Sequence, residues 1–187
     1  NPERLLLSIA LLGTVPRSRQ VLRSGAKAGD AIFVTGTLGG SLSGRHFDFE
    51  PRLPEARWLA ERFTVHAMID LSDGLAGDLR HILDASGVGA DLLSSAIPIS
   101  RAARLQSRAE SSAKPPLLAA LTDGEDFELL FTVASRTAVP LLDAWKAQFP
   151  EVKLSCVGKI TSQPGLRLSD ARGLREFSLR GYEHFSS

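Results

Sequence analysis

Apolar residues along the chain fall into short runs and into repeats of helical spacing, and the two patterns alternate. Runs that are rich in β-branched and aromatic residues and that end at turn residues predict strands. They lie at 5–13, at 31–36, at 65–69, within 121–133 and at 155–161, and a turn-rich hairpin follows at 162–173. Apolar positions at helical spacing predict helices at 54–63, from Leu75 to a stop at Gly87, and at 137–149. Strands that alternate with helices are typical of an α/β (α+β layered) domain, in which helices cover a sheet.

Two segments between these elements are rich in turn residues. Four glycines within 36–44 make a flexible segment where the backbone could approach a ligand closely, although the same pattern also serves as a plain turn. The polar stretch 106–116, which ends in two prolines, predicts an exposed loop without chemistry.

The composition is that of a globular domain with a substantial core. Of the 187 residues 43% are hydrophobic and 23% are charged, so a single domain over 1–187 is the simplest prediction. A net charge of +1 gives no electrostatic footprint for nucleic acid or an anionic membrane, and no apolar run reaches the roughly 18 residues of a membrane span. The only cysteine, Cys156, cannot form an internal disulfide, fits a cytoplasmic protein, and is expected to be a small buried residue.

Three aspartates crowd the turn between a predicted strand and a predicted helix. Asp70, Asp73 and Asp78 lie within nine residues of the segment AMIDLSDGLAGDLRH, 67–81. On one helical face Asp70 and Asp73 would repel by about 3 kcal/mol, whereas a helix N-terminus offsets only about 0.3–1 kcal/mol per acid. A divalent cation would remove this deficit, and carboxylate oxygens favour Mg²⁺ or Ca²⁺. On the same turn Ser72 could donate a hydrogen bond to a phosphate oxygen.

A simpler interpretation of this turn stays open. Asp73 or Ser72 would then only cap the helix. Asp78 is expected to face solvent or to support the metal ligands from behind. Spacing alone does not choose between a capped helix and a metal site.

A second acidic cluster surrounds Gly124 in the segment DGEDFELLF, 123–131. Its acids either decorate a solvated turn or hold a cationic substrate group or another metal. They are Asp123, Glu125, Asp126 and Glu128. The four histidines show no Cys/His metal spacing, and the chain has neither a G-x-S-x-G nor a G-x-x-x-x-G-K-[ST] motif. This argues against a serine hydrolase and a P-loop NTPase of the familiar kinds.

Together the motifs resemble thiamine-monophosphate kinase, in the superfamily of ATP-using enzymes that includes aminoimidazole ribonucleotide synthetase. The segments that carry the resemblance, in the family's order, are RSGAKAGDAIFVTGTLGGS (23–41), AMIDLSDGLAGDL (67–79), DGEDFELLFTV (123–133), VGKIT (157–161) and GYEHF (181–185). DLSDGL together with GEDFELLF is a specific pair. The resemblance implies the C-terminal α/β domain of such an enzyme, with a mixed sheet covered by helices. The chain opens at Asn1 without Met, and residues 1–15 would hold the strand that connects an N-terminal ATP-binding domain.

The resemblance assigns roles around the first acidic turn. Arg23 and Ser72 match positions that contact ATP, and Asp70 and Asp73 match magnesium ligands. The implied reaction is Mg²⁺-dependent transfer of the ATP γ-phosphoryl group to thiamine monophosphate, giving thiamine diphosphate. Because the acceptor is an ionised phosphate, direct in-line transfer organised by Asp70 and Asp73 needs no obligatory nucleophile or strong base.

The resemblance also assigns Glu125 and Tyr182 to the thiamine phosphate substrate. Tyr182 suits this role because an aromatic face can lie against a flat cationic heterocycle, although a tyrosine near a chain end also commonly closes a core. The chain departs from the family pattern at three positions. Gly40 stands where Asp is common, Asp123 where Gly is common, and Phe127 where Tyr is commoner.

Two other functions remain as alternatives. The first keeps the superfamily and changes the acceptor, as in a selenophosphate synthetase, an aminoimidazole ribonucleotide synthetase or a carbamoyl-dehydrating maturation factor; the GEDFELLF and GYEHF pair favours thiamine phosphate over these. The second is a non-catalytic ligand-binding fragment. ATP and thiamine monophosphate are the expected partners, the full-length protein is expected to be a homodimer, and the isolated fragment is expected to be inactive.

Overall fold

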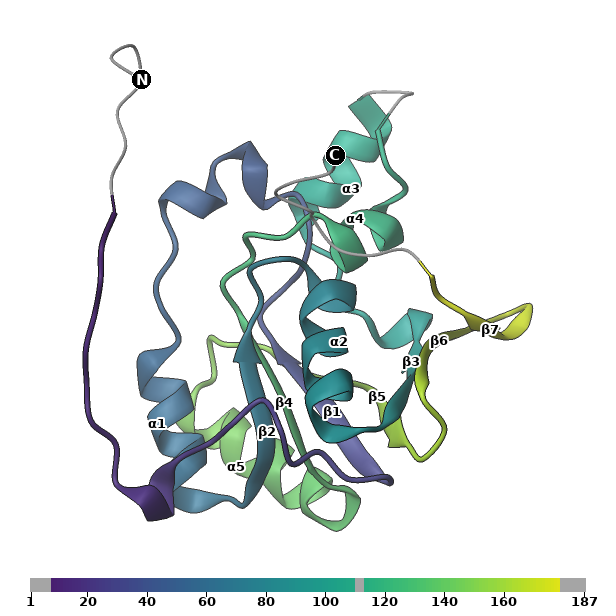
Figure 1. The fold of residues 1–187 in the computed structure, drawn as a ribbon. Helices are drawn as coiled ribbons and strands as arrows, with labels where there is room; N and C mark the ends of the chain where they lie inside the picture. Colours follow the sequence, from purple (N-terminus) through teal and green to yellow (C-terminus); the bar gives the residue numbers. More distant parts are fainter. Residues whose placement is uncertain (1–7, 110–112, 179–187) are drawn as a thin grey trace.

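A computed structural model describes residues 8–109 and 113–178 of the chain, and its centre is a mixed sheet (Figure 1). The strands, in sequence order, are β1 (Asp30–Thr35), β2 (Val65–Asp70), β3 (Gly89–Leu93), β4 (Leu129–Ala134), β5 (Leu154–Thr161), β6 (Gly165–Asp170) and β7 (Gly173–Glu176). They lie side by side in the order β2-β4-β1-β5-β3-β6-β7. The β3–β6 pair is parallel and the other pairs are antiparallel.

Helices lie on both faces of this sheet (Figure 1). They are α1 (Leu53–Arg62), α2 (Leu75–Ser86), α3 (Arg101–Ala109), α4 (Pro116–Thr122) and α5 (Ala138–Gln148). Short 3₁₀ turns lie at Arg17–Arg19, Ser41–Ser43, Arg45–Phe47, Ser94–Ala96 and Ser135–Thr137. The described helices include none with the length and apolar content to cross a membrane. The predicted class, a layered α/β domain with a mixed sheet covered by helices, is confirmed.

The alternation of side chains along β1 builds two separate cores. Ile32 and Val34 face the side of the sheet that α2 and α4 cover. Phe33 faces the other side, where its ring stacks on Phe131 at 5.6 Å beneath α1 and α5. Successive strand residues point to opposite faces, so a central strand with both faces covered reads as one continuous apolar run.

Helix α2 follows the predicted pattern. Its apolar side chains Leu75, Leu79, Ile82 and Leu83 are at most 3% exposed and pack on the sheet. The helix ends at Gly87, which adopts φ +66° and donates its N–H to the Leu83 carbonyl, the left-handed stop that glycine favours. Because α2 begins only five residues after β2 ends, the intervening acidic turn is held between two buried elements.

Three predictions about local structure were wrong. Residues 8–13 of the apolar run form no strand: Ile9, Leu11 and Leu12 are 84%, 90% and 102% exposed, and the segment stands apart from the sheet (Figure 1). An apolar run forms a buried strand only where it can pair with the edge of a sheet. At the β2 edge it is the Leu22 carbonyl that accepts the N–H of Met68, at 3.0 Å. The stretch 106–116 is also not simply a loop, because α3 continues to Ala109 and α4 begins at Pro116.

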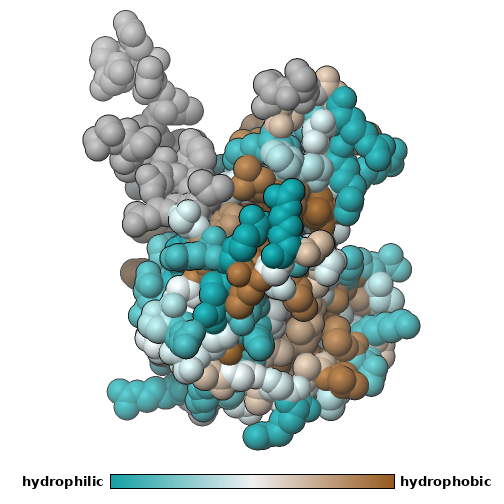
Figure 2. All heavy atoms as spheres, turned by 90° about the vertical axis from the view of Figure 1, so that its right-hand side faces the viewer, coloured by the Kyte–Doolittle hydropathy of each residue, from teal (hydrophilic) through white to brown (hydrophobic). Residues whose placement is uncertain are grey.

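The third error concerns Cys156, which is exposed rather than buried. On β5 it alternates with the buried Val157 and therefore points to the opposite face of the sheet. There it lines a pocket of about 410 Å³ with Leu93 and Leu174, each about half exposed. Figure 2 shows apolar side chains among polar ones on the side of the molecule that carries the β6–β7 hairpin.

Candidate functional site

The first acidic turn joins the end of β2 to the start of α2. Asp70 is the exposed last residue of β2, Ser72 and Asp73 are partly exposed, and Gly74 is the N-cap of α2 with φ +95°. Because the N-cap residue is Gly74, neither Ser72 nor Asp73 occupies the N-cap position itself. A residue further along the helix also orients this turn.

That residue is Asp78, one turn into α2. Its side chain is 1% exposed, and its carboxylate accepts the backbone N–H of Asp73 at 2.9 Å. Burial raises the pKa of Asp78 to about 7, against the opposing effect of this hydrogen bond, and the negative charges of Asp73 and Asp70 add to the rise. Asp78 thus supports the turn from behind and does not face solvent.

A histidine on the same helix, to which the motifs assign no role, lies close to this turn. The Nε2 atom of His81 lies 3.8 Å from Oδ2 of Asp73, and ligand atoms of Asp73, Asp78 and His81 all lie within 4.8 Å of one another. The signal was present as Asp78 and His81 at i and i+3, a spacing that puts two side chains on one helical face.

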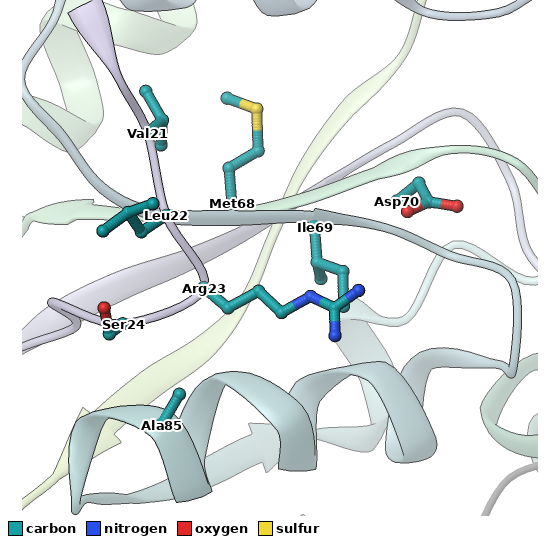
Figure 3. Close-up of a pocket in the computed structure, with 8 residues that line it drawn as sticks. All are labelled: Val21, Leu22, Arg23, Ser24, Met68, Ile69, Asp70 and Ala85. Atoms are coloured by element: carbon teal, nitrogen blue, oxygen red, sulfur yellow. The ribbon is translucent and has the colours of Figure 1, made fainter. Parts of the chain in front are cut away.

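Asp70 opens onto a pocket that also contains Arg23. The pocket has a volume of about 540 Å³, and its wall includes residues 21–24, the end of β2 and Ala85 of α2. Figure 3 shows the Arg23 guanidinium between β2 and α2, beside Ile69, whereas the Asp70 side chain projects from the other side of the strand. An acidic and a basic residue from segments 47 positions apart thus line the same cavity.

The backbone around Arg23 is fixed by two contacts. The hydroxyl of Ser86, the last residue of α2, accepts the N–H groups of Gly25 and Ala26, each at 3.2 Å. Gly25 has φ +114°, and a Cβ there would lie 2.6 Å from the carbonyl oxygen of His66. A substitution at Gly25 would therefore move the loop that carries Arg23.

The second acidic turn is joined to the first by backbone hydrogen bonds. The N–H of Glu125 donates to the Ser72 carbonyl at 2.7 Å, that of Phe127 to the Leu71 carbonyl at 2.8 Å, and that of Leu71 to the Glu128 carbonyl at 2.8 Å. A Cβ at Gly124, which has φ +73°, would lie 2.6 Å from the Ser72 carbonyl oxygen. Two motifs about fifty residues apart therefore form one structural unit.

Two acids of the second turn hold the glycine segment 36–44 and its neighbours in place. Asp126 accepts the Gly39 N–H at 3.0 Å and the Ser41 hydroxyl, and burial raises its pKa to about 6. Glu128, 1% exposed, accepts hydrogen bonds from Arg52, Arg45 and Thr35. The predicted alternatives of a solvated turn or a second metal do not describe these two residues.

Glu125 differs from these neighbours. It is partly exposed and makes no side-chain hydrogen bond or ion pair with any residue in the described part of the chain. Glu125 and Phe127 both have positive φ angles, +52° and +50°, which residues with a Cβ adopt at a cost. The remaining predicted substrate contact, Tyr182, lies outside the described residues.

Two departures from the family pattern meet in the structure. Asp123 accepts the N–H of Gly40 at 3.1 Å and forms an ion pair with Lys114 at 2.9 Å. The family pattern commonly has a carboxylate at position 40. In this chain Asp123 supplies a carboxylate that contacts the backbone of that position. Phe127, the third departure, stacks on Phe49 with ring centroids 4.1 Å apart.

Comparisons with known proteins identify the class to which this fold and site belong. The family model described as AIR synthase related protein, C-terminal domain, matches residues 27–170, and the chain belongs to this family. E. coli HypE, a hydrogenase maturation protein, aligns over 91% of this chain and 56% of its own with a TM-score of 0.73, but at 23% identity it shows the fold alone.

More specific similarity points to one enzyme of the family. Thiamine-monophosphate kinase of Rhodopirellula baltica is 43% identical over 182 residues, which are 96% of this chain and 55% of the relative. The structure of AaThiL complexed with AMPPCP and TMP aligns over 88% of this chain and 54% of its own, with a TM-score of 0.66 and 27% identity. The chain therefore spans about half the length of these proteins.

Proposed function

We propose that this chain is the C-terminal part of a thiamine-monophosphate kinase, which transfers the γ-phosphoryl group of ATP to thiamine monophosphate. The observation that carries the proposal is the backbone pairing of the Ser72 turn with the Glu125 turn. This pairing brings the proposed ATP and metal residues beside a proposed substrate residue. The similarity to AaThiL, whose structure is a complex with AMPPCP and TMP, supports a protein that binds a nucleotide and a phosphate acceptor.

The donor set fits Mg²⁺. Asp70 and Asp73 supply carboxylate oxygens, the ligand type that this hard cation takes, and their negative charges add to the effect of burial that raises the pKa of Asp78. When bound, Mg²⁺ would neutralise charge on the transferred phosphate. We assign its binding to Asp70 and Asp73, with Asp78 orienting the Asp73 backbone.

The chain's own residues divide the remaining work. Arg23 would bind ATP phosphate in the pocket that it lines together with Asp70, and Ser72 would donate a hydrogen bond to a phosphate oxygen. Glu125 and Tyr182 would bind the thiamine moiety. Because phosphoryl transfer depends on positioning and charge stabilisation, the reaction is assigned to direct in-line attack by the acceptor phosphate, with no phosphoenzyme.

The proposal extends to the organisation of the whole enzyme. Residues 1–187 would form a single C-terminal domain, and residues 1–15 would connect it to an N-terminal domain with further ATP and metal ligands. The exposed apolar side chains at 9–12 are consistent with a partner surface on such a domain. The full-length protein would be a cytoplasmic homodimer that binds neither nucleic acid nor membrane, and the isolated chain would be inactive.

A substrate panel tests the proposal against its alternatives. The full-length protein is incubated with Mg²⁺ and ATP plus one acceptor at a time: thiamine monophosphate, selenide, the aminoimidazole ribonucleotide precursor or a carbamoylated peptide. Formation of thiamine diphosphate from the first alone supports the kinase. ATP consumption with another acceptor would replace it by that superfamily member, and no consumption with any acceptor would favour a non-catalytic module.

A further inference from the structure

We propose that Phe127 and Phe49 form an aromatic support for the ring system of the phosphate acceptor, directly beside Glu125. The inference rests on the proposed function, because it names the surface of that site that recognises a flat, positively charged heterocycle. Neither phenylalanine belongs to the residues that the motifs assign to a ligand.

The second acidic turn alternates between buried and accessible side chains. Asp126 and Glu128 are each 1% exposed and point inward, toward the glycine segment and Arg52 respectively. Glu125 and Phe127 alternate with them and remain partly exposed. A carboxylate and an aromatic ring two residues apart on one turn are therefore both accessible.

The backbone of this turn is held in an unfavourable conformation. Glu125 and Phe127 both lie in the left-handed region, with φ +52° and +50°. Their N–H groups are fixed by the carbonyls of Ser72 and Leu71. Such strain persists only where the surrounding structure enforces it, and it is concentrated at ligand sites. The direction of both side chains is thus set by the same bonds that join the two acidic turns.

Phe49 widens the aromatic surface. It comes from the segment that follows the glycine loop, and its ring stacks on Phe127 at a centroid distance of 4.1 Å and an interplanar angle of 23°. Phe49 is 39% exposed, so the pair is not sealed inside the core. Two rings from segments 78 positions apart present one accessible apolar surface.

The charges around the stack favour a cationic ligand over a neutral one. Arg45 and Arg52, which flank Phe49 in the sequence, are paired with Glu128, whereas Glu125 has no side-chain partner among the described residues. An aromatic face attracts cations through its quadrupole, and a neighbouring carboxylate adds direct attraction. The combination suits a positively charged thiazolium ring and the flat ring attached to it.

Steady-state kinetics on the full-length protein test the inference. Phe49→Leu and Phe127→Leu keep apolar bulk and remove the aromatic face, so each is expected to raise KM for thiamine monophosphate about three- to tenfold and leave KM for ATP unchanged. Phe127→Tyr restores the aromatic face and is expected to behave like the wild type. The matched control is Phe47→Leu, because Phe47 is 86% exposed on the same segment but lies outside the stack.

A substrate analogue separates recognition of the ring's charge from a change in the shape of the binding surface. An analogue of thiamine monophosphate with a neutral five-membered ring should bind the wild type more weakly in calorimetry, and the difference should shrink in Phe49→Leu and Phe127→Leu. Unchanged affinities in both variants, or equal effects on ATP and the acceptor, would overturn the inference. If the wild type makes no thiamine diphosphate, the proposed function is refuted, and calorimetry with thiamine monophosphate still tests the aromatic support. If the wild type does not bind thiamine monophosphate, both the proposed function and the aromatic support are refuted.

Discussion

Replacing Glu128 by alanine is the sharpest test of how the second acidic turn is built. Its carboxylate accepts Thr35 Oγ1 at 2.6 Å, Arg52 Nε at 2.8 Å and Nη2 at 3.0 Å, and a further hydrogen bond from Arg45. Removing one partner of a buried ion pair costs about 3–5 kcal/mol. Because the Arg52 and Arg45 side chains are 21% and 33% exposed, water can hydrogen-bond to them after the substitution. We therefore expect the free energy of unfolding to fall by the lower value of this range, about 3 kcal/mol.

Denaturant unfolding of the full chain, followed by circular dichroism, measures this change. In thermal unfolding, a loss of about 3 kcal/mol in the free energy of unfolding lowers the melting temperature of a domain of this size by about 6–12 °C. The matched control is Glu61→Ala, which removes an exposed ion pair to Arg19 at 3.3 Å and should cost about 0.2–1 kcal/mol. A loss at Glu128 no larger than the loss at Glu61 would refute the conclusion that this network holds the turn in place.

Three further predictions address other parts of the site. Gly124→Ala places a Cβ 2.6 Å from a carbonyl of the first turn at φ +73°, so it should destabilise the fold by about 1–3 kcal/mol and lower kcat, as unfolding and kinase assays would show. The pKa of Asp126 is about 6 in the native state against an ordinary 3.8, so the native state binds this proton more tightly than the unfolded state does. The free energy of unfolding should therefore fall as pH rises from about 4 to 6, and Asp126→Asn should make that fall shallower in unfolding curves across this range. Ser86→Ala removes the acceptor for two N–H groups in the loop that carries Arg23, and should raise KM for ATP several-fold with little change for the acceptor, whereas Ser86→Thr should not.

Local patterns in the sequence predicted much of the fold because the elements concerned are defined by their neighbours in the chain. Strands β1 and β2 and helix α2 follow from apolar spacing and from the glycine at 87. Strand β3 was missed because it is short and carries Asp91, whose charge is matched by Arg167 at 2.7 Å. Such a pairing across two strands leaves no local signal.

In the candidate site, too, some features have a local sequence signal and others depend on residues far apart in the chain. The two acidic motifs were recognisable as places of chemistry, but their backbone pairing depends on the neighbouring positions of β2 and β4 in the sheet. For the same reason the roles of Asp78 and Asp126 as buried acceptors of backbone N–H groups could not be predicted. Spacing identifies acidic residues, whereas burial decides which of them are structural.

In the proposed enzyme the turn from Asp70 to Asp73 and the turn around Glu125 form one site for Mg²⁺-dependent phosphoryl transfer. The most direct measurement is the rate at which the full-length protein forms thiamine diphosphate from ATP and thiamine monophosphate, with and without Asp70→Asn or Asp73→Asn. We predict a loss of at least about a hundredfold in either variant, with the melting temperature preserved. Turnover at the wild-type rate in both variants would show that these two aspartates do not hold a metal ion needed for the reaction.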